Sequence, residues 1–100
     1  MYFVLGSIYV LIEENNQCDD KGHTYIKNET DCKKAGYKMG ATAFMAETNE
    51  FYPKGCYVRL GAALFNRHST GRRLLDAAPI CIADGKIPYS LFSMVSFIDA

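Results

Sequence analysis

Small and apolar residues near the middle of the chain follow a helical spacing. They recur at i, i+3, i+4 and i+7, which places them on one face of a helix. The residues of this face are Cys32, Ala35, Gly36 and Met39. Lys33, Lys34 and Lys38 fall on the opposite face. We expect Thr30 to cap the start of this helix and Gly40 to end it, so the pattern predicts a short amphipathic helix with a cysteine on its buried face.

The pattern changes from helical to alternating further along the chain. Residues 52–56 contain Pro and Gly and predict a turn, and residues 56–60 alternate as a half-buried strand does. A tight turn at residues 61–62 and a returning strand at residues 63–66 would complete a β-hairpin. Residues 79–82 predict a last short strand. We therefore expect an α+β fold, in which one short helix packs on a small, mostly antiparallel sheet with a central hairpin.

Both ends of the chain are apolar. Residues 2–12 form a run that is too short to span a bilayer, which takes about 20 residues. This run fits either a first strand or a degraded signal peptide that lacks the usual basic residues and cleavage site. Residues 87–98 fit either a last strand or the start of a longer segment. We divide the chain into an apolar N-terminal segment (1–17), a central module (18–82) and an apolar C-terminal segment (83–100).

Composition and charge narrow the class of protein. One hundred residues, 13% of them aromatic, suit a single folded domain, and a net charge of zero argues against a nucleic-acid binder. Acids outnumber bases in residues 13–31, whereas residues 51–75 contain no acid. The cations of the second region are Lys54, Arg59, Arg67, Arg72 and Arg73. One interpretation is that the two regions pair across the fold or are simply solvated. The other is that the basic region forms a patch for an anion such as a sulfated glycan or phosphate.

The four cysteines lie far apart in the sequence. They are Cys18, Cys32, Cys56 and Cys81. Cysteine zinc sites use close pairs of ligands, which this chain lacks. An even number of cysteines at wide spacing instead indicates two disulfides in a small extracellular domain, with four reduced and buried cysteines as the intracellular alternative. Asn28 begins an Asn-Glu-Thr glycosylation sequon, which fits a secreted glycoprotein.

Several short motifs occur in a fixed order along the central module. They are C-x-x-A at Cys32, P-x-G-C-Y at residues 53–57, Phe-Asn at residues 65–66, and P-x-C at residues 79–81. This order resembles a recurrent four-cysteine module of uncharacterised proteins from marine invertebrates and unicellular algae. The similarity covers residues 18–82. It implies a small, disulfide-bonded, extracellular module, and it carries no established activity.

Four cysteines allow three pairings. We favour the nested pairing, Cys32–Cys56 and Cys18–Cys81, because it ties the helix to the hairpin and joins the two ends of the module. The larger of the two closed loops would stabilise the fold by about 4–5 kcal/mol in the chain-entropy model. A strong reductant should then unfold the domain or lower its melting temperature.

Catalytic and metal chemistry have little support in the residue types. A nucleophilic pair of Cys56 and His68 would need a free thiolate, which a disulfide removes. A zinc site that includes Cys18 and His23 gains no support from their spacing. The chain also lacks a glycine-rich phosphate loop and a serine elbow. We therefore predict no enzyme activity, no metal and no cofactor.

Residues 66–73 are expected to form a loop and are the best candidate for a binding site. Binding residues concentrate on loops held by a rigid scaffold, and guanidinium groups suit carboxylate, sulfate or phosphate. The candidate ligand-binding residues are Arg67, His68, Arg72 and Arg73, together with Tyr57 beside the preceding turn. Asn66 is expected to bond nearby backbone instead, and Tyr57 has packing in the core as its alternative.

The sequence as a whole predicts a non-catalytic binding or adhesion module at the cell surface or outside the cell. Its expected partner is an anionic glycan or another surface protein. Nucleic acid and a membrane span are not expected. Two alternatives stay open: a purely structural module of a larger surface protein, and a metal-binding protein or thiol-dependent enzyme that uses Cys and His.

Overall fold

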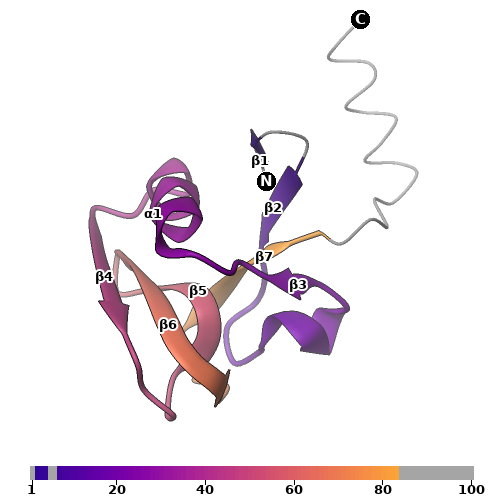
Figure 1. The fold of residues 1–100 in the computed structure, drawn as a ribbon, viewed down its shortest axis with the longest axis vertical. Helices are drawn as coiled ribbons and strands as arrows, with labels where there is room; N and C mark the ends of the chain where they lie inside the picture. The colour runs from indigo at the N-terminus through magenta and orange to yellow at the C-terminus, as the bar shows by residue number, and fades with distance from the viewer. Residues whose placement is uncertain (1, 5–6, 84–100) are drawn as a thin grey trace, which may run out of the picture.

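A computed structural model describes residues 2–4 and 7–83 of the chain, and Figure 1 shows their arrangement. The elements in chain order are β1 (Tyr2–Val4), β2 (Ser7–Leu11), the 3₁₀ helix η1 (Cys18–Lys21), β3 (Thr24–Tyr25), α1 (Glu29–Lys38), β4 (Ala43–Glu47), β5 (Pro53–Arg59), β6 (Ala62–Gly71) and β7 (Ala78–Ile82). The strand or longer segment expected at residues 87–98 lies outside the described residues. No helix of the described part is long and apolar enough to cross a bilayer.

One sheet joins all the described strands, in the order β1-β2-β7-β5-β6-β4. β3 pairs with β7 beyond the point where β5 stops pairing with it. Among these strands only β4 and β6 run parallel, and the other pairs are antiparallel. The α+β fold with a mostly antiparallel sheet is therefore confirmed. Figure 1 shows α1 beside the end of the sheet that contains β4, β5 and β6.

The helix has the predicted buried face, and its start differs from the prediction. Asn28, rather than Thr30, is the N-cap residue, because its backbone is extended and its side-chain oxygen accepts a hydrogen bond from the Asp31 N–H at 2.8 Å. The helix ends at Lys38, and Gly40 follows with a φ of +98°. Gly36 lies so close to β6 that a Cβ there would overlap the Cβ of Ala63.

The central hairpin is confirmed, with a turn one residue earlier than predicted. β5 and β6 are joined by Leu60 and Gly61, which both have positive φ (52° and 81°). A two-residue turn with two positive φ values matches the twist of the strands that it joins. The sequence places this turn one residue later because Leu rarely adopts positive φ.

Two further predictions for this half of the chain are wrong. Residues 52–56 do not form a turn, because β5 begins at Pro53 and Gly55 is the positive-φ residue of a bulge. Residues 66–73 do not form a loop, because β6 continues through Gly71. Between the pairs Gly55–Asn66 and Pro53–Gly71, residues 67–70 of β6 lie opposite Lys54 alone, so that they bulge from the ladder. The sequence also predicts no strand at residues 41–50, where β4 lies.

Two disulfides hold this sheet and helix together. Cys32–Cys56 joins α1 to β5, and Cys18–Cys81 joins η1 to β7, which confirms the favoured nested pairing. All four cysteines are fully buried. The core between α1 and the sheet contains Tyr9, Ile26, Cys32, Ala35, Cys56, Phe65 and Ile80. Burial of these apolar side chains is the main stabilising contribution of this layer.

Candidate functional site

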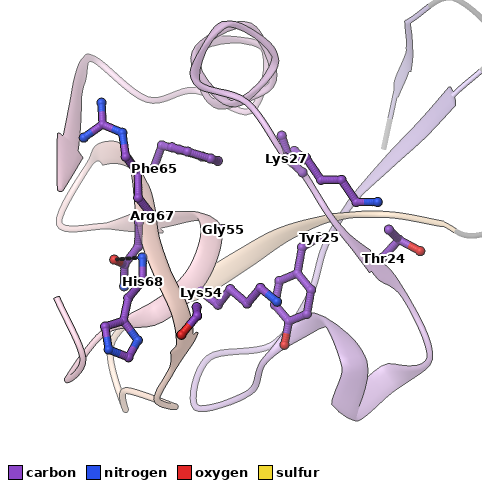
Figure 2. Close-up of a pocket in the computed structure, with 11 residues that line it drawn as sticks. Thr24, Tyr25, Lys27, Lys54, Gly55, Phe65, Arg67 and His68 are labelled. Carbon is purple, nitrogen blue, oxygen red and sulfur yellow. Dashed lines mark hydrogen bonds between the residues drawn. The ribbon is translucent and has the colours of Figure 1, made fainter. Parts of the chain in front are cut away.

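A hollow of about 320 Å³ lies between the chain that follows β3 and the bulge of β6. One wall comes from residues 24–27, and the other from Lys54, Gly55 and residues 65–69. Figure 2 shows Lys54 beside the Tyr25 ring at the base of this space, with Lys27 and Phe65 above them. The hollow therefore joins two segments that are distant in the sequence.

Gly55 allows these two walls to approach each other. Its φ is +80°, and a Cβ at this position would lie 3.2 Å from Cδ1 of Tyr25 and 3.4 Å from the carbonyl oxygen of Ile26. A side chain here would be strained and would crowd the opposite wall. The glycine thus places Tyr25 against β5 and forms the base of the hollow.

Tyr25 and Lys54 form a fixed pair at this base. The Lys54 Nζ lies 4.6 Å from the centroid of the Tyr25 ring, within the range of a cation–π interaction. The Tyr25 hydroxyl donates a hydrogen bond to Oδ1 of Asp19 at 2.7 Å. Burial, followed by this contact with Asp19, raises the pKa of Tyr25 above its ordinary value. Tyr25 is therefore a neutral hydrogen-bond donor at neutral pH.

His68 is held by the backbone of the bulge. Its Nδ1 accepts hydrogen bonds from the Gly71 N–H at 2.9 Å and the Thr70 N–H at 3.2 Å. An acceptor at Nδ1 places the proton of the neutral ring on Nε2. The bulge therefore orients one donor, Nε2–H, away from its own backbone.

Gln17 replaces the strand pairing that the bulge removes. Its Oε1 accepts from the Lys54 N–H at 2.7 Å, and its Nε2 donates to the Thr70 carbonyl oxygen at 3.0 Å. One side-chain amide thus bridges β5 and β6 where their backbones separate. Without this amide, a donor and an acceptor of the two strands would lose these partners.

Asn66 anchors the loop beside the bulge. Its Oδ1 accepts from the backbone N–H groups of Asn49 and His68, and its Nδ2 donates to carbonyl oxygens at Asn49, Tyr52 and Pro53. The side chain is buried, and every polar atom of its amide has a partner. The expected structural role of Asn66 is confirmed.

The five predicted ligand-binding residues do not converge on one site. Arg67 and His68 line the hollow, and Figure 2 shows their side chains extending in opposite directions. Arg67 also forms an ion pair with Glu29 of α1. Arg72 lies over the Phe51 ring at 5.1 Å, and its guanidinium is not part of the hollow.

Arg73 and Tyr57 lie elsewhere. The Arg73 guanidinium binds both carboxylate oxygens of Asp20, with Nε to Oδ2 at 2.7 Å. Tyr57 is fully buried, and its hydroxyl donates to the Glu47 carboxylate. A role for Tyr57 in ligand contact is wrong, because its ring has no exposed surface to present. The alternative of a packed core position is the one observed.

Ion pairs across the fold use part of the basic region. Arg67–Glu29 and Arg73–Asp20 each join a base from residues 51–75 to an acid from residues 13–31. This is the pairing that the sequence offered as one of two interpretations of its charge pattern. The hollow nevertheless has no acidic residue in its lining, and it combines Lys27, Lys54, Arg67 and His68.

Three lining residues were not predicted from the sequence: Tyr25, Lys27 and Phe65. The contact of Lys54 with the Tyr25 ring was not predicted either. Tyr25 follows Cys18, and Lys54 precedes Cys56. The nested disulfides bring these two segments together, because Cys18 binds Cys81 while Cys56 pairs with the adjacent Ile80. The favoured cysteine pairing was therefore the signal that could have identified this pair.

The positions of the cysteines bear on the two alternatives of a thiol-dependent enzyme and a metal-binding protein. All four cysteines of the chain are in disulfides, so none supplies a thiol for a nucleophile or a metal. Within the described ranges, no group of three or more His, Cys, Asp or Glu residues is placed to hold a metal ion. The cysteine-dependent alternative thus has no thiol to use.

Comparison of the chain with protein-family models, with curated proteins and with solved structures finds no match.

Proposed function

We propose that the protein is a non-catalytic extracellular binding module, and that the hollow between residues 24–27 and the β6 bulge binds an anionic glycan. The observation that carries this proposal is the lining of the hollow. It combines Lys27, Lys54, Arg67 and His68 with the half-buried Tyr25, and with no carboxylate. Sugar rings use apolar and aromatic surface, and sulfate or carboxylate groups use cationic donors.

The cationic side chains that line the hollow differ in whether the protein already pairs their charge. Lys27 is exposed at the rim, and Lys54 lies on the Tyr25 ring. His68 also lines the hollow, whereas the Arg67 charge is balanced by Glu29. We therefore assign Lys27 and Lys54 the largest contribution to binding of an oxyanion.

The extracellular assignment has separate support. Two disulfides that use every cysteine of the chain are typical of proteins that fold in an oxidising compartment. Asn28, the first residue of the sequon, is exposed and lies next to Lys27 at the rim of the hollow. Its amide also caps α1, with Nδ2 donating to the Asp31 carboxylate at 2.9 Å.

A purely structural module is the second candidate. The ion pairs Arg67–Glu29 and Arg73–Asp20 favour it, because they give two of the candidate binding arginines a role within the fold. This candidate predicts that the domain has no measurable affinity for any glycan.

The test is calorimetric titration with a size-defined sulfated oligosaccharide of the heparin type and with its desulfated form. We expect binding of the sulfated form alone, with an affinity that falls as salt rises. Lys27→Ala and Lys54→Ala should each weaken it by about tenfold or more, since a charged hydrogen bond contributes about 1.5–3 kcal/mol. Inorganic sulfate as the titrant separates recognition of the anion from recognition of the sugar.

Lys38→Ala is the matched control, because Lys38 is exposed in the last turn of α1 and does not line the hollow. It should leave the affinity unchanged. Equal losses in Lys38→Ala and Lys54→Ala would show non-specific attraction to a polyanion and would contradict the proposal. Absence of binding at low salt would favour the structural module.

A further inference from the structure

β4 forms one edge of the sheet, and no described strand pairs with its outer side. Figure 1 shows it at the far left, outside β6. Its pairing with β6 is regular over five residues, from Ala43–Ala62 to Glu47–Asn66, so no bulge twists it away. An edge strand of this kind presents unpaired backbone N–H and C=O groups to solvent.

The common devices that block edge pairing are absent from β4. Its sequence, Ala-Phe-Met-Ala-Glu, contains no Lys, Arg or Pro. Its one charged residue, Glu47, accepts a hydrogen bond from the buried Tyr57 hydroxyl. The Glu47 carboxylate is therefore hydrogen-bonded over one face of the sheet, and it does not place a free charge at the open edge of β4.

Exposed apolar side chains accompany this edge. Met45, at the centre of β4, is 59% exposed, and Leu60 is 82% exposed in the turn that meets the start of β4 through the Thr42 N–H to Gly61 O hydrogen bond. The helix contacts both β6 and β4 and still leaves these two side chains exposed. The uncovered part of the sheet thus combines a backbone edge with apolar surface.

We propose that β4 pairs antiparallel with β4 of a second copy of this chain, which forms a two-fold dimer with one continuous sheet. The strand is complementary to itself about Met45. In this register Met45 lies opposite its own copy, Phe44 lies opposite Ala46, and Ala43 lies opposite Glu47. No like charges face each other, and the net charge of zero adds no overall repulsion between copies.

This dimer is weak, because it rests on a five-residue strand and a small apolar surface. Dimerisation would raise the number of ligand-binding sites in one molecule from one to two. A dimer carries two of the cationic hollows, so that a repetitive glycan could engage both at once. The dimer itself does not depend on the proposed function, since neither β4 nor Leu60 lines the hollow.

Sedimentation equilibrium over a range of protein concentrations tests the proposal. We expect the weight-average mass to rise from 11.2 kDa toward twice that value as concentration increases. Met45→Lys places two ammonium groups opposite each other at the two-fold axis and should hold the protein at the monomer mass. Leu11→Lys is the matched control, because Leu11 is 48% exposed on β2, which three strands separate from β4. It should dimerise as the wild type does.

Hydrogen exchange identifies what covers the edge. Protection of the β4 amides that point away from β6 should increase with protein concentration in the wild type and in Leu11→Lys, and not in Met45→Lys. A monomer in which these outward-pointing amides are equally protected at every concentration would indicate that a segment of this chain covers the edge, and it would overturn the proposal. A monomer in which they stay unprotected at every concentration, or a dimer that persists in Met45→Lys, would overturn it as well.

Discussion

The core between α1 and the hairpin and the bulge of β6 are held together in different ways. In the core, α1 packs on β5 and β6 through buried apolar residues and the Cys32–Cys56 bridge. In the bulge of residues 67–70 and at Gly71, where the bulge ends, side-chain amides and an imidazole satisfy backbone groups beside the ladder. The first region depends on how much apolar surface is buried, and the second depends on hydrogen-bond geometry.

This difference predicts how each region responds to change. Apolar contacts are not directional, so the core should accommodate a substitution when a neighbour compensates in volume. The bulge has no such freedom, because its glycine approaches backbone atoms and its polar partners are specific. Substitutions in the two regions should therefore differ in their effect on stability.

Removal of either disulfide should cause the largest loss of stability. The Cys18–Cys81 bridge spans a sequence separation of 63, and Cys32–Cys56 spans 24. The chain-entropy model gives losses of about 4.3 and about 3.5 kcal/mol for the Cys18→Ala/Cys81→Ala and Cys32→Ala/Cys56→Ala variants. Urea unfolding measures both. A midpoint that did not move in either double variant would contradict the stabilising role of that bridge.

Gly71→Ala should be the most damaging single substitution in the bulge. Gly71 has a φ of +59°, and a Cβ there would lie 2.5 Å from the Lys54 nitrogen and 2.6 Å from the Tyr52 carbonyl oxygen. Strain and overlap with backbone together should cost about 2–4 kcal/mol.

Gly22→Ala is the control for strain alone, because Gly22 has a φ of +73° and no atom within 4 Å of the added Cβ. It should cost about 1 kcal/mol in the same urea experiment. Equal effects of the two substitutions would show that the close approach in the bulge contributes nothing.

Gly36→Ala tests the core in the same manner. The new methyl group would overlap the Cβ of Ala63, which should cost about 1–3 kcal/mol despite the better helix propensity of Ala. The exchange Gly36→Ala/Ala63→Gly moves the methyl group to the other side of the contact and should recover part of this loss. A double variant less stable than Gly36→Ala would show that the helix–sheet contact is as specific as the bulge.

The same contrast explains how much of the structure the sequence predicts. The buried helix face follows from the spacing of apolar residues along the sequence. The disulfide pairing was one of three that four cysteines allow, and it was favoured because it joins the helix to the hairpin. The extension of β6 through Gly71 could not be predicted, because Asn, Ser, Thr and Gly are typical of loops. The hydrogen bonds that Gln17 makes to Thr70 and Lys54 join residues that are 53 and 37 positions apart in the sequence, so no local pattern indicates them.

The candidate site was predictable only in part for a related reason. Arg67 and His68 lie in the hollow, whereas Arg72 and Arg73 point to partners that no local pattern reveals. Tyr25 and Lys54 meet because a bulge at Gly55 and a bridge at Cys81 place them together. β4 was missed because its Ala-rich sequence lacks clear alternation, and its parallel pairing depends on β6.

The Asp20–Arg73 ion pair should make the stability of the fold depend weakly on pH. The Arg73 guanidinium, with the Gln17 N–H, lowers the pKa of Asp20 below its ordinary value. Stability from this pair is therefore present above the unfolded pKa of about 3.9 and is lost as pH falls through the folded value. Arg73→Ala should lower the melting temperature by a few degrees at pH 7 and by nothing at pH 2.

The ion pair is exposed to solvent, and salt screens its charges. The change in melting temperature should therefore be smaller at high ionic strength. Arg72→Ala is the matched control, because Arg72 is also exposed and contacts the Phe51 ring instead of a carboxylate. Loss of stability at pH 2 as large as at pH 7 would show that Arg73 acts through packing of its side chain and not through its charge.

Leu60→Asn should give the smallest change, and its sign is opposite. Leu60 has a φ of +52° in a turn whose next residue is Gly61, also at positive φ. Asn-Gly is the preferred pair for this turn because Asn tolerates positive φ, so the variant should be more stable by about 0.5–1 kcal/mol. Leu75→Asn, at a residue that is 73% exposed without positive φ, should not gain stability. Equal gains in both variants would trace the effect to lost apolar exposure, and the turn that joins β5 to β6 would then be relaxed rather than strained.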